Sequence, residues 1–234
     1  MLFRSMDLDF PETPDFPANA FQFDLDEYFG QLNRLKEQYK GKLDLRIGVE
    51  IGLQKHLGEA YHRLTEAYPF DFVIGSVHLV GGQDPYYRKI FEGRTDEEVY
   101  RMAFREILEN VEAVKDFDAL GHLDYVVRYG IHQAAEYSYR KFSDEIDAVL
   151  KKLIAEGKGL EMNLAGIKYG LGFPNPHPDV LKRYRELGGE IITIGADAHE
   201  PAHVAYEFEK ATEILRECGF SYYAEFHGRK PVFQ

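Results

Sequence analysis

The sequence predicts an α/β barrel built as a single domain over residues 1–234. Two observations predict it. Apolar stretches with strand character end five times at a polar residue able to bind metal or substrate, and each is followed by a helical pattern. In α/β barrels, these strand ends carry the chemistry. An open doubly wound sheet would also alternate strands and helices, but would gather its ligands near one switch point.

Length and composition narrow the class of protein. A chain of 234 residues can bury one substantial core, and a barrel of this length is ordinarily one domain. The single cysteine, Cys218, excludes an intrachain disulfide and, with no signal-like segment near the start, indicates the cytoplasm. No apolar run is long enough to span a membrane. The net charge of -12 argues against a nucleic-acid partner, but local charges can still hold a small anionic substrate.

The first half of the chain predicts alternating loops, helices and strands. The first 23 residues, rich in Asp, Pro and Phe, have no sustained period and predict a loop. Helical spacing from Leu25 to Tyr39 predicts the first helix, which Gly41 ends. Residues 43–48 then form a strand pattern that places Glu50 at its end. After helical spacing over 60–67, the apolar run 70–78 closes on His78.

The second half repeats this alternation. Thr95 begins a capping box before a helix over 99–111, and the strand pattern 117–122 ends in His122. Ser143 is a candidate N-cap for a helix over 146–154, which the strand pattern 160–163 follows. A helix through 181–184 leads to the β-branched run 190–199, where Asp197 and His199 stand at the strand's end. A last helix is predicted over 202–218.

Five strand-end side chains are candidate metal ligands: Glu50, His78, His122, Asp197 and His199. Carboxylates and imidazoles suit zinc, manganese or iron, and no thiolate is among them. A bridging carboxylate with several histidines favours two or more metals. Two metals about 3.5 to 4 Å apart can bind the attacking and the leaving oxygen, and can lower the pKa of water from about 15.7 to near 7. Hydrolysis of a phosphate ester fits this pattern.

Each ligand also has a structural interpretation. A single strand-end histidine is more often a hydrogen-bonded core or loop residue, and Glu50 alone can serve as a helix cap. Asp197 and His199 are stronger candidates, because two alternate residues leaving one strand can reach the same centre. The joint pattern of five residues is what favours the metal site.

Two further residues are candidates for binding substrate. Arg128 lies in the loop after a ligand-bearing strand, where its guanidinium could bind a phosphate through paired hydrogen bonds, although a solvated loop position is an equal alternative. Asn163 could orient the substrate or only satisfy backbone groups at its turn. The sequence contains no GxxxxGK[ST] or GxGxxG segment, so nucleotide-cradling loops are not supported.

Read in order, five short motifs resemble those of the polymerase and histidinol phosphatase (PHP) superfamily, in its histidinol-phosphatase branch. They are Gly48–Gly52, Gly75–His78, Gly121–Asp124, Glu161–Asn163 and Gly195–His199. The likeness covers nearly the whole chain, including Asp84-Pro-Tyr86. It implies a distorted (β/α)7 TIM-like barrel with two to three divalent metal ions. It also implies a small phosphorylated substrate, namely hydrolysis of histidinol phosphate to histidinol and phosphate in histidine biosynthesis.

The resemblance assigns roles position by position. Glu50 resembles the bridging carboxylate, and Arg128 resembles a phosphate-contacting arginine. The later metal ligands correspond to His78, His122, Asp197 and His199. In this interpretation Glu50, Asp197 and Arg128 are the catalytic residues, and Arg128 and Asn163 bind the substrate.

The sequence departs from the family at its start. The family begins with a strand bearing a His-x-His pair, and Ser5 stands here where a later ligand histidine would be expected. We therefore expect a barrel without its first strand-helix-strand unit. A late start, completion by another chain and a reduced relative are all compatible with this. An exposed gap would favour a homo-oligomer. The rival functions are a phosphoesterase for another small ester and a catalytically silent domain with an incomplete metal site.

Overall fold

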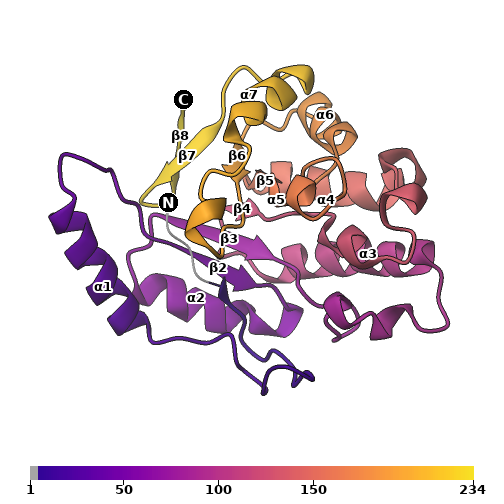
Figure 1. Cartoon of the computed structure of the whole chain (residues 1–234), viewed down its shortest axis with the longest axis horizontal. Coiled ribbons are helices and arrows are strands. Elements are labelled where there is room, and N and C mark those ends of the chain that lie inside the picture. Colours follow the sequence, from indigo (N-terminus) through magenta and orange to yellow (C-terminus); the bar gives the residue numbers. More distant parts are fainter. Residues whose placement is uncertain (1–4) are drawn as a thin grey trace.

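A six-stranded parallel sheet forms the centre of the fold in the computed structural model, which describes residues 5–234 (Figure 1). Its strands lie side by side in chain order: β1 (Ser5–Met6), β2 (Gly48–Gly52), β3 (Phe72–Ser76), β4 (Ala119–Leu120), β5 (Gly159–Asn163) and β6 (Ile192–Gly195). The order never reverses, so the sheet lacks the switch point of a doubly wound fold. Within the described residues β1 and β6 are not paired, and the sheet has two open edges.

Helices follow the strands, as expected for this class. They are α1 (Leu25–Gln38), α2 (Gly58–Ala67), α3 (Asp96–Ala113), α4 (Ser143–Ala155), α5 (Ala165–Lys168), α6 (Pro178–Glu186) and α7 (Phe208–Glu217), with short 3-10 helices between them. The capping box at Thr95 is confirmed. Nowhere in residues 5–234 does a helix combine the length and apolar character needed to cross a membrane.

Several predicted boundaries are wrong. Ser5–Met6 is a strand and not a loop, because it pairs with β2, while residues 1–4 lie outside the described part of the chain. Glu50 lies inside its strand, since β2 begins only at Gly48. Ser143 is the first residue of α4 and makes no capping hydrogen bond. The last helix begins at Phe208, because Glu207 just before it has a positive φ of 57°.

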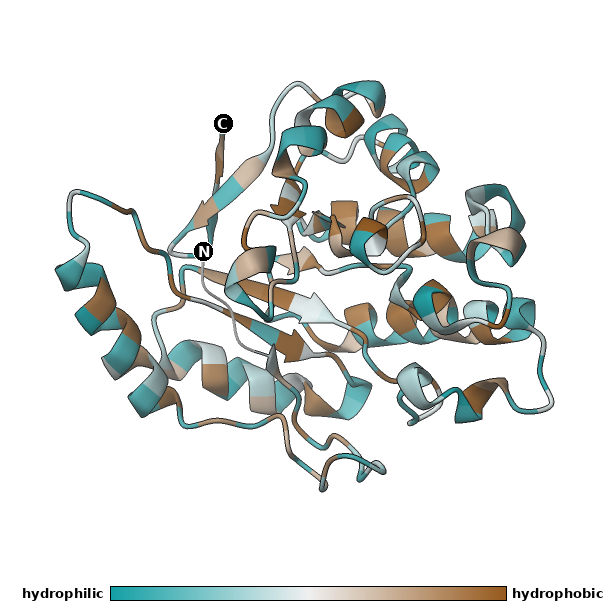
Figure 2. Ribbon diagram, viewed as in Figure 1, coloured by the Kyte–Doolittle hydropathy of each residue, from teal (hydrophilic) through white to brown (hydrophobic). Residues whose placement is uncertain are grey.

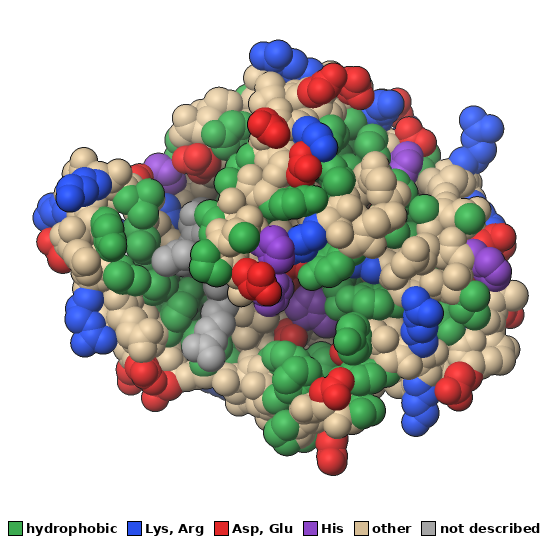
Figure 3. Space-filling view, in the orientation of Figure 1, with side chains coloured by type: hydrophobic (Ala, Val, Ile, Leu, Met, Phe, Trp, Pro, Cys, Tyr) green, Lys and Arg blue, Asp and Glu red, His purple; other side chains and the backbone are tan. Residues whose placement is uncertain are grey.

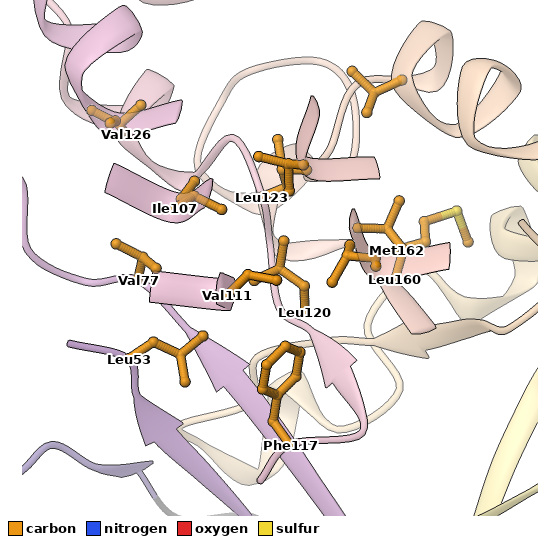
Figure 4. Close-up of a cluster of buried hydrophobic side chains, with 14 of the residues drawn as sticks. Leu53, Val77, Ile107, Val111, Phe117, Leu120, Leu123, Val126, Leu160 and Met162 are labelled. Carbon is orange, nitrogen blue, oxygen red and sulfur yellow. The ribbon is translucent and has the colours of Figure 1, made fainter. Parts of the chain in front are cut away.

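The two faces of the sheet have different chemistry. Side chains alternate between the faces along each strand. One set, which includes Val49, Val73, Leu120 and Leu160, packs against the helices in the main core. Figure 4 shows part of this packing, and Figure 2 shows apolar stripes on the helices. The alternate residues, which include Glu50, point to the opposite face of the sheet. The space on that face is here called the interior.

A C-terminal hairpin fills one end of this interior. It consists of β7 (Ala224–His227) and β8 (Lys230–Phe233), which pair antiparallel and were not predicted from the sequence. The Phe226 ring stacks on that of Phe72 with centroids 4.5 Å apart. Ile74, Ala119 and Ala224 complete this second apolar cluster. The hairpin thus closes the part of the interior where β3 and β4 begin, and leaves the other part to polar side chains.

The hairpin provides the first testable prediction. Phe226→Ala is expected to lower the free energy of unfolding by about 3 kcal/mol, because it opens a cavity against Phe72. Phe233→Ala is the control, since that ring is 49% exposed and should cost under about 0.5 kcal/mol. Urea denaturation of both variants measures the difference. If Phe226→Ala lowered the free energy of unfolding as little as Phe233→Ala does, the hairpin would not support the core.

Candidate functional site

Three predicted ligands meet in the interior of the sheet. Glu50 comes from β2, while His78 and His122 follow β3 and β4. Each offers a ligand atom, and these atoms all lie within 4.8 Å of one another. Glu50 Oε1 is 3.2 Å from the Nε2 atoms of both histidines. Figure 3 shows histidine side chains gathered near the centre of the face in view. The sheet register therefore brings residues 72 positions apart into contact.

Charge holds this group together. Burial would raise the pKa of Glu50, but hydrogen bonds from His122 and His78 outweigh it and hold that pKa well below its usual value. Burial would lower the pKa of His78, but the nearby carboxylates of Asp7 and Glu50 raise it well above its usual value. The group thus favours a negatively charged Glu50 beside a protonated His78. A divalent cation that bound to it would displace the proton of His78.

The edge strand β1 supports two of these residues. Asp7, just after β1, lies 3.0 Å from His78 Nδ1 through its Oδ2 atom. Ser5 Oγ donates a hydrogen bond of 2.9 Å to Glu50 Oε2. A Cβ at Gly52 would overlap the carboxylate of Asp7, so glycine leaves the room that this contact needs. Partners of this kind orient a ligand imidazole and fix which nitrogen faces the metal.

A second carboxylate, Glu161 on β5, lies beside the group. Its Oε2 accepts hydrogen bonds of 3.1 Å from His122 N and from Asn163 Nδ2. Burial raises the pKa of Glu161. Asn163 Oδ1 accepts from Ala165 N at 2.9 Å, so both ends of this amide are used inside the protein. These contacts favour the structural alternative for Asn163 over a substrate-binding role.

Glycines give Glu161 its space, which leads to a second prediction. A Cβ at Gly195 would overlap Glu161 Oε1. Gly195→Ala is therefore expected to destabilise the fold by about 2 kcal/mol, since the buried carboxylate must leave its hydrogen bonds. Gly30→Ala is the matched control, because this exposed position in α1 has nothing within 4 Å of a Cβ and should gain up to about 1 kcal/mol. Thermal melts of both variants give the comparison.

Arg128 lies in η4 (Tyr125–Tyr129), after β4, with its side chain only 4% exposed. Its Nε donates to Asn175 Oδ1 at 2.9 Å, and its Nη1 lies 3.4 Å from Asp197 Oδ2. The guanidinium lies over the rings of Tyr125 and Tyr169, 5.1 and 4.8 Å from their centroids. Its Nη2 is buried and has no partner among the described residues. The Nη2 edge of this cation is thus left for an anion.

A buried carboxylate fixes this arginine through Asn175. Asp124 is fully buried and accepts hydrogen bonds from Asn175 Nδ2 and, at 2.8 Å, from His177 N. Because an ionised carboxylate only accepts, the amide group of Asn175 must present its oxygen to Arg128. Asp124 therefore acts as a positioning residue for the guanidinium.

The remaining two predicted ligands follow the end of β6. Asp197 has φ 47° and faces Arg128, and its backbone oxygen accepts from Lys168 Nζ at 3.1 Å. His199 has a side chain 71% exposed and an Nδ1 that lies 3.0 Å from the Asp197 oxygen. Neither belongs to the group of Glu50, His78 and His122. The positive φ turns the chain sharply after β6, which a strand pattern does not reveal.

The donor set fits a divalent metal. It offers one carboxylate oxygen and two imidazole nitrogens, which zinc, manganese and iron all accept. His122 Nδ1, Ser76 Oγ and Thr193 Oγ1 are also buried without a hydrogen-bond partner among the described residues. Unpaired polar atoms are costly in an interior, so their presence here points to a polar occupant.

Comparison with known proteins decides the family. The PHP domain family matches residues 6–165, more than half of the chain. The chain belongs to the PHP domain family. A histidinol-phosphatase from Lactococcus lactis is 31% identical over 226 residues, which cover 92% of this chain and 80% of that protein. A protein named probable histidinol-phosphatase from Clostridium acetobutylicum is 32% identical, with 94% of this chain and 80% of that protein covered.

A solved structure of a PHP relative has the same fold. The histidinol phosphate phosphatase of Lactococcus lactis, complexed with zinc, L-histidinol and phosphate, superposes with a TM-score of 0.82. It is 28% identical, and the match covers 97% of this chain and 84% of that one. Nearly all of this chain thus has its counterpart in that structure.

Proposed function

We propose that this chain is a metal-dependent phosphomonoesterase that hydrolyses histidinol phosphate to histidinol and phosphate. The observation that carries the proposal is the close group of Glu50, His78 and His122 at one end of the sheet interior. The histidinol-phosphatase relatives and the zinc, histidinol and phosphate complex of the Lactococcus lactis protein support the same substrate. The reaction belongs to histidine biosynthesis.

Five residues are proposed to hold the metals. Glu50, His78 and His122 would hold them together, and Asp197 and His199 would add donors from the end of β6. His199 Nε2 has no hydrogen-bond partner among the described residues, which leaves it free for this role. When bound, two to three divalent ions such as zinc, manganese or iron supply Lewis acidity toward the phosphate ester and lower the pKa of water.

The guanidinium of Arg128 is proposed to bind the phosphate. Arg128 Nη2 carries two N–H donors that no described residue uses. They are held in place by Asn175 on one side and by two tyrosine rings on the faces. A preorganised guanidinium of this kind stabilises the negative charge that grows on the phosphoryl oxygens during transfer.

Phosphate release by the purified chain tests the proposal. The chain is assayed with histidinol phosphate after chelation and after adding back zinc, manganese or iron(II), and bound metal is counted by elemental analysis. We expect activity to be lost on chelation and restored by metal, with two or more metal ions per chain. Turnover that does not respond to chelation, or no turnover with any metal, would contradict the proposal.

A further inference from the structure

One buried tyrosine contacts both strands at the point where the pairing of β1 with β2 stops. Tyr61, in α2, is fully buried. Its hydroxyl donates to Gly52 O at 2.8 Å and lies 3.2 Å from Met6 O, and these are the last residues of β2 and β1. The same oxygen accepts a hydrogen bond of 3.3 Å from Leu8 N. A single side chain therefore joins the ends of the two strands.

The contacts of this hydroxyl lie on both sides of Asp7. Met6 O belongs to the peptide group before Asp7, and Leu8 N belongs to the peptide group after it. Burial raises the pKa of Tyr61, and the nearby charge of Asp7 adds to this rise. The hydroxyl therefore keeps the proton that it needs as a donor. The backbone on either side of Asp7 is thus held by one group.

Gln54 provides a second anchor for the same segment. Its Nε2 donates to Leu8 O at 2.9 Å, while Leu8 N donates to the Tyr61 hydroxyl. Both backbone groups of Leu8 are therefore bonded to side chains from the segment that follows β2. Asp7 N donates to Phe21 O, in a turn. Because the pairing of β1 with β2 has already ended here, side chains take over from the sheet in satisfying this backbone.

We propose that Tyr61 is a positioning residue for metal binding by Glu50, His78 and His122. Fixing the backbone around Asp7 places its carboxylate, which lies 3.0 Å from His78 Nδ1. That contact sets the direction of His78 Nε2, which lies 3.2 Å from Glu50 Oε1. Among residues 5–234, Tyr61 forms no hydrogen bond with these three candidate ligands, so it acts through Asp7. The inference rests on the proposed function and deepens it.

Tyr61→Phe tests this role, because it removes one oxygen and keeps the ring. We expect the affinity of the chain for zinc to fall about tenfold, since groups that orient a ligand imidazole contribute about ten- to a hundredfold to metal affinity. Competition with a chromophoric zinc chelator measures this affinity. An affinity equal to that of the wild-type chain would overturn the positioning role.

Tyr184→Phe is the matched control. Tyr184, in α6, is also buried, and its hydroxyl lies 3.2 Å from Ile191 O and 3.3 Å from Lys158 O. Each substitution removes a buried hydroxyl that contacts backbone oxygens, so each should lower the melting temperature by about 2 to 8 °C. Only Tyr61→Phe should also weaken zinc binding. A similar loss of zinc affinity in both variants would reflect stability alone and would overturn the role.

A double-mutant cycle with Asp7→Asn shows whether Tyr61 acts through Asp7. Asp7→Asn alone is expected to weaken zinc binding about ten- to a hundredfold, because it removes the carboxylate that holds His78. Adding Tyr61→Phe to Asp7→Asn should then cost less than about twofold, since there is no carboxylate left to position. Two losses that multiply would mean that the residues act independently, which contradicts the inference.

Gln54→Ala provides a variant that leaves the core unchanged, because Gln54 is only partly buried. It removes the hydrogen bond to Leu8 O and should weaken zinc binding about three- to tenfold. Gln31→Ala, at an exposed position in α1, is its control and should leave zinc affinity unchanged. If Tyr61→Phe fails to fold, Gln54→Ala decides the question, and wild-type affinity in this variant counts against the inference.

Zinc affinity separates this inference from the proposed function, because binding requires no turnover. A wild-type chain that binds zinc but releases no phosphate from histidinol phosphate contradicts the proposed function alone. In that case the tenfold loss in Tyr61→Phe, absent from Tyr184→Phe, still supports the positioning role. A wild-type chain that binds no zinc overturns it.

Discussion

Glu50→Gln is expected to lower phosphate release from histidinol phosphate by about a thousandfold or more while leaving the fold intact. The change removes the negative charge that lies between two imidazole Nε2 atoms, each 3.2 Å away, yet keeps the shape of the side chain. A neutral amide is a poor ligand for a divalent ion, so metal content should fall together with activity. Elemental analysis and phosphate release on the same preparation measure both.

The control for Glu50→Gln is the same substitution at Glu213, an exposed residue of α7. It should leave metal content, activity and circular dichroism unchanged. If Glu50→Gln kept both its metal and its turnover, Glu50 would have no place in the mechanism.

Arg128→Lys should reduce kcat/KM by about a hundredfold although it keeps the positive charge. Lysine has three N–H donors, so it cannot donate to Asn175 and Asp197 while also presenting two donors to a phosphate. It would also lose the planar packing between Tyr125 and Tyr169. Steady-state kinetics with histidinol phosphate measure the loss.

Arg140→Lys is the matched control for this change, since Arg140 is exposed in η6 (Tyr139–Phe142). A melting temperature close to wild type would show that Arg128→Lys has not unfolded the site. Kinetics within about threefold of wild type would mean that only the charge of Arg128 matters.

The fold could be predicted because its signals are local. Apolar runs entered through glycine and followed by helical spacing are visible in the chain, and the β5 and β6 patterns predicted their strands to within a few residues. The β1 strand could not be found this way, because two residues at a sheet edge have no periodicity. The C-terminal hairpin was not predicted, for a similar reason. Its role depends on Phe226 meeting Phe72, and that contact spans most of the chain.

The grouping of three candidate residues could be predicted from polar side chains at or near strand ends. His78 and His122 follow their strands and Glu50 lies within β2, and the structure brings the three together. Glu161 carried a detectable signal as a single residue, since a carboxylate inside an apolar strand pattern needs an explanation. Asp7 gave no such signal, because its contact with His78 depends on strand pairing 71 residues away.

The order of the group formed by Glu50, His78 and His122 depends on the order of the short edge strand β1. Among the residues that the structure describes, Ser5 and Met6 pair only with β2. Edge segments with so few hydrogen bonds open locally at a small fraction of the global unfolding cost. Each opening would carry Ser5 and Asp7 away from Glu50 and His78, leaving both ligands without these contacts. Binding of a metal by this group would therefore be thermodynamically linked to amide-exchange protection at this edge, although β1 itself supplies none of the three clustered candidate ligands.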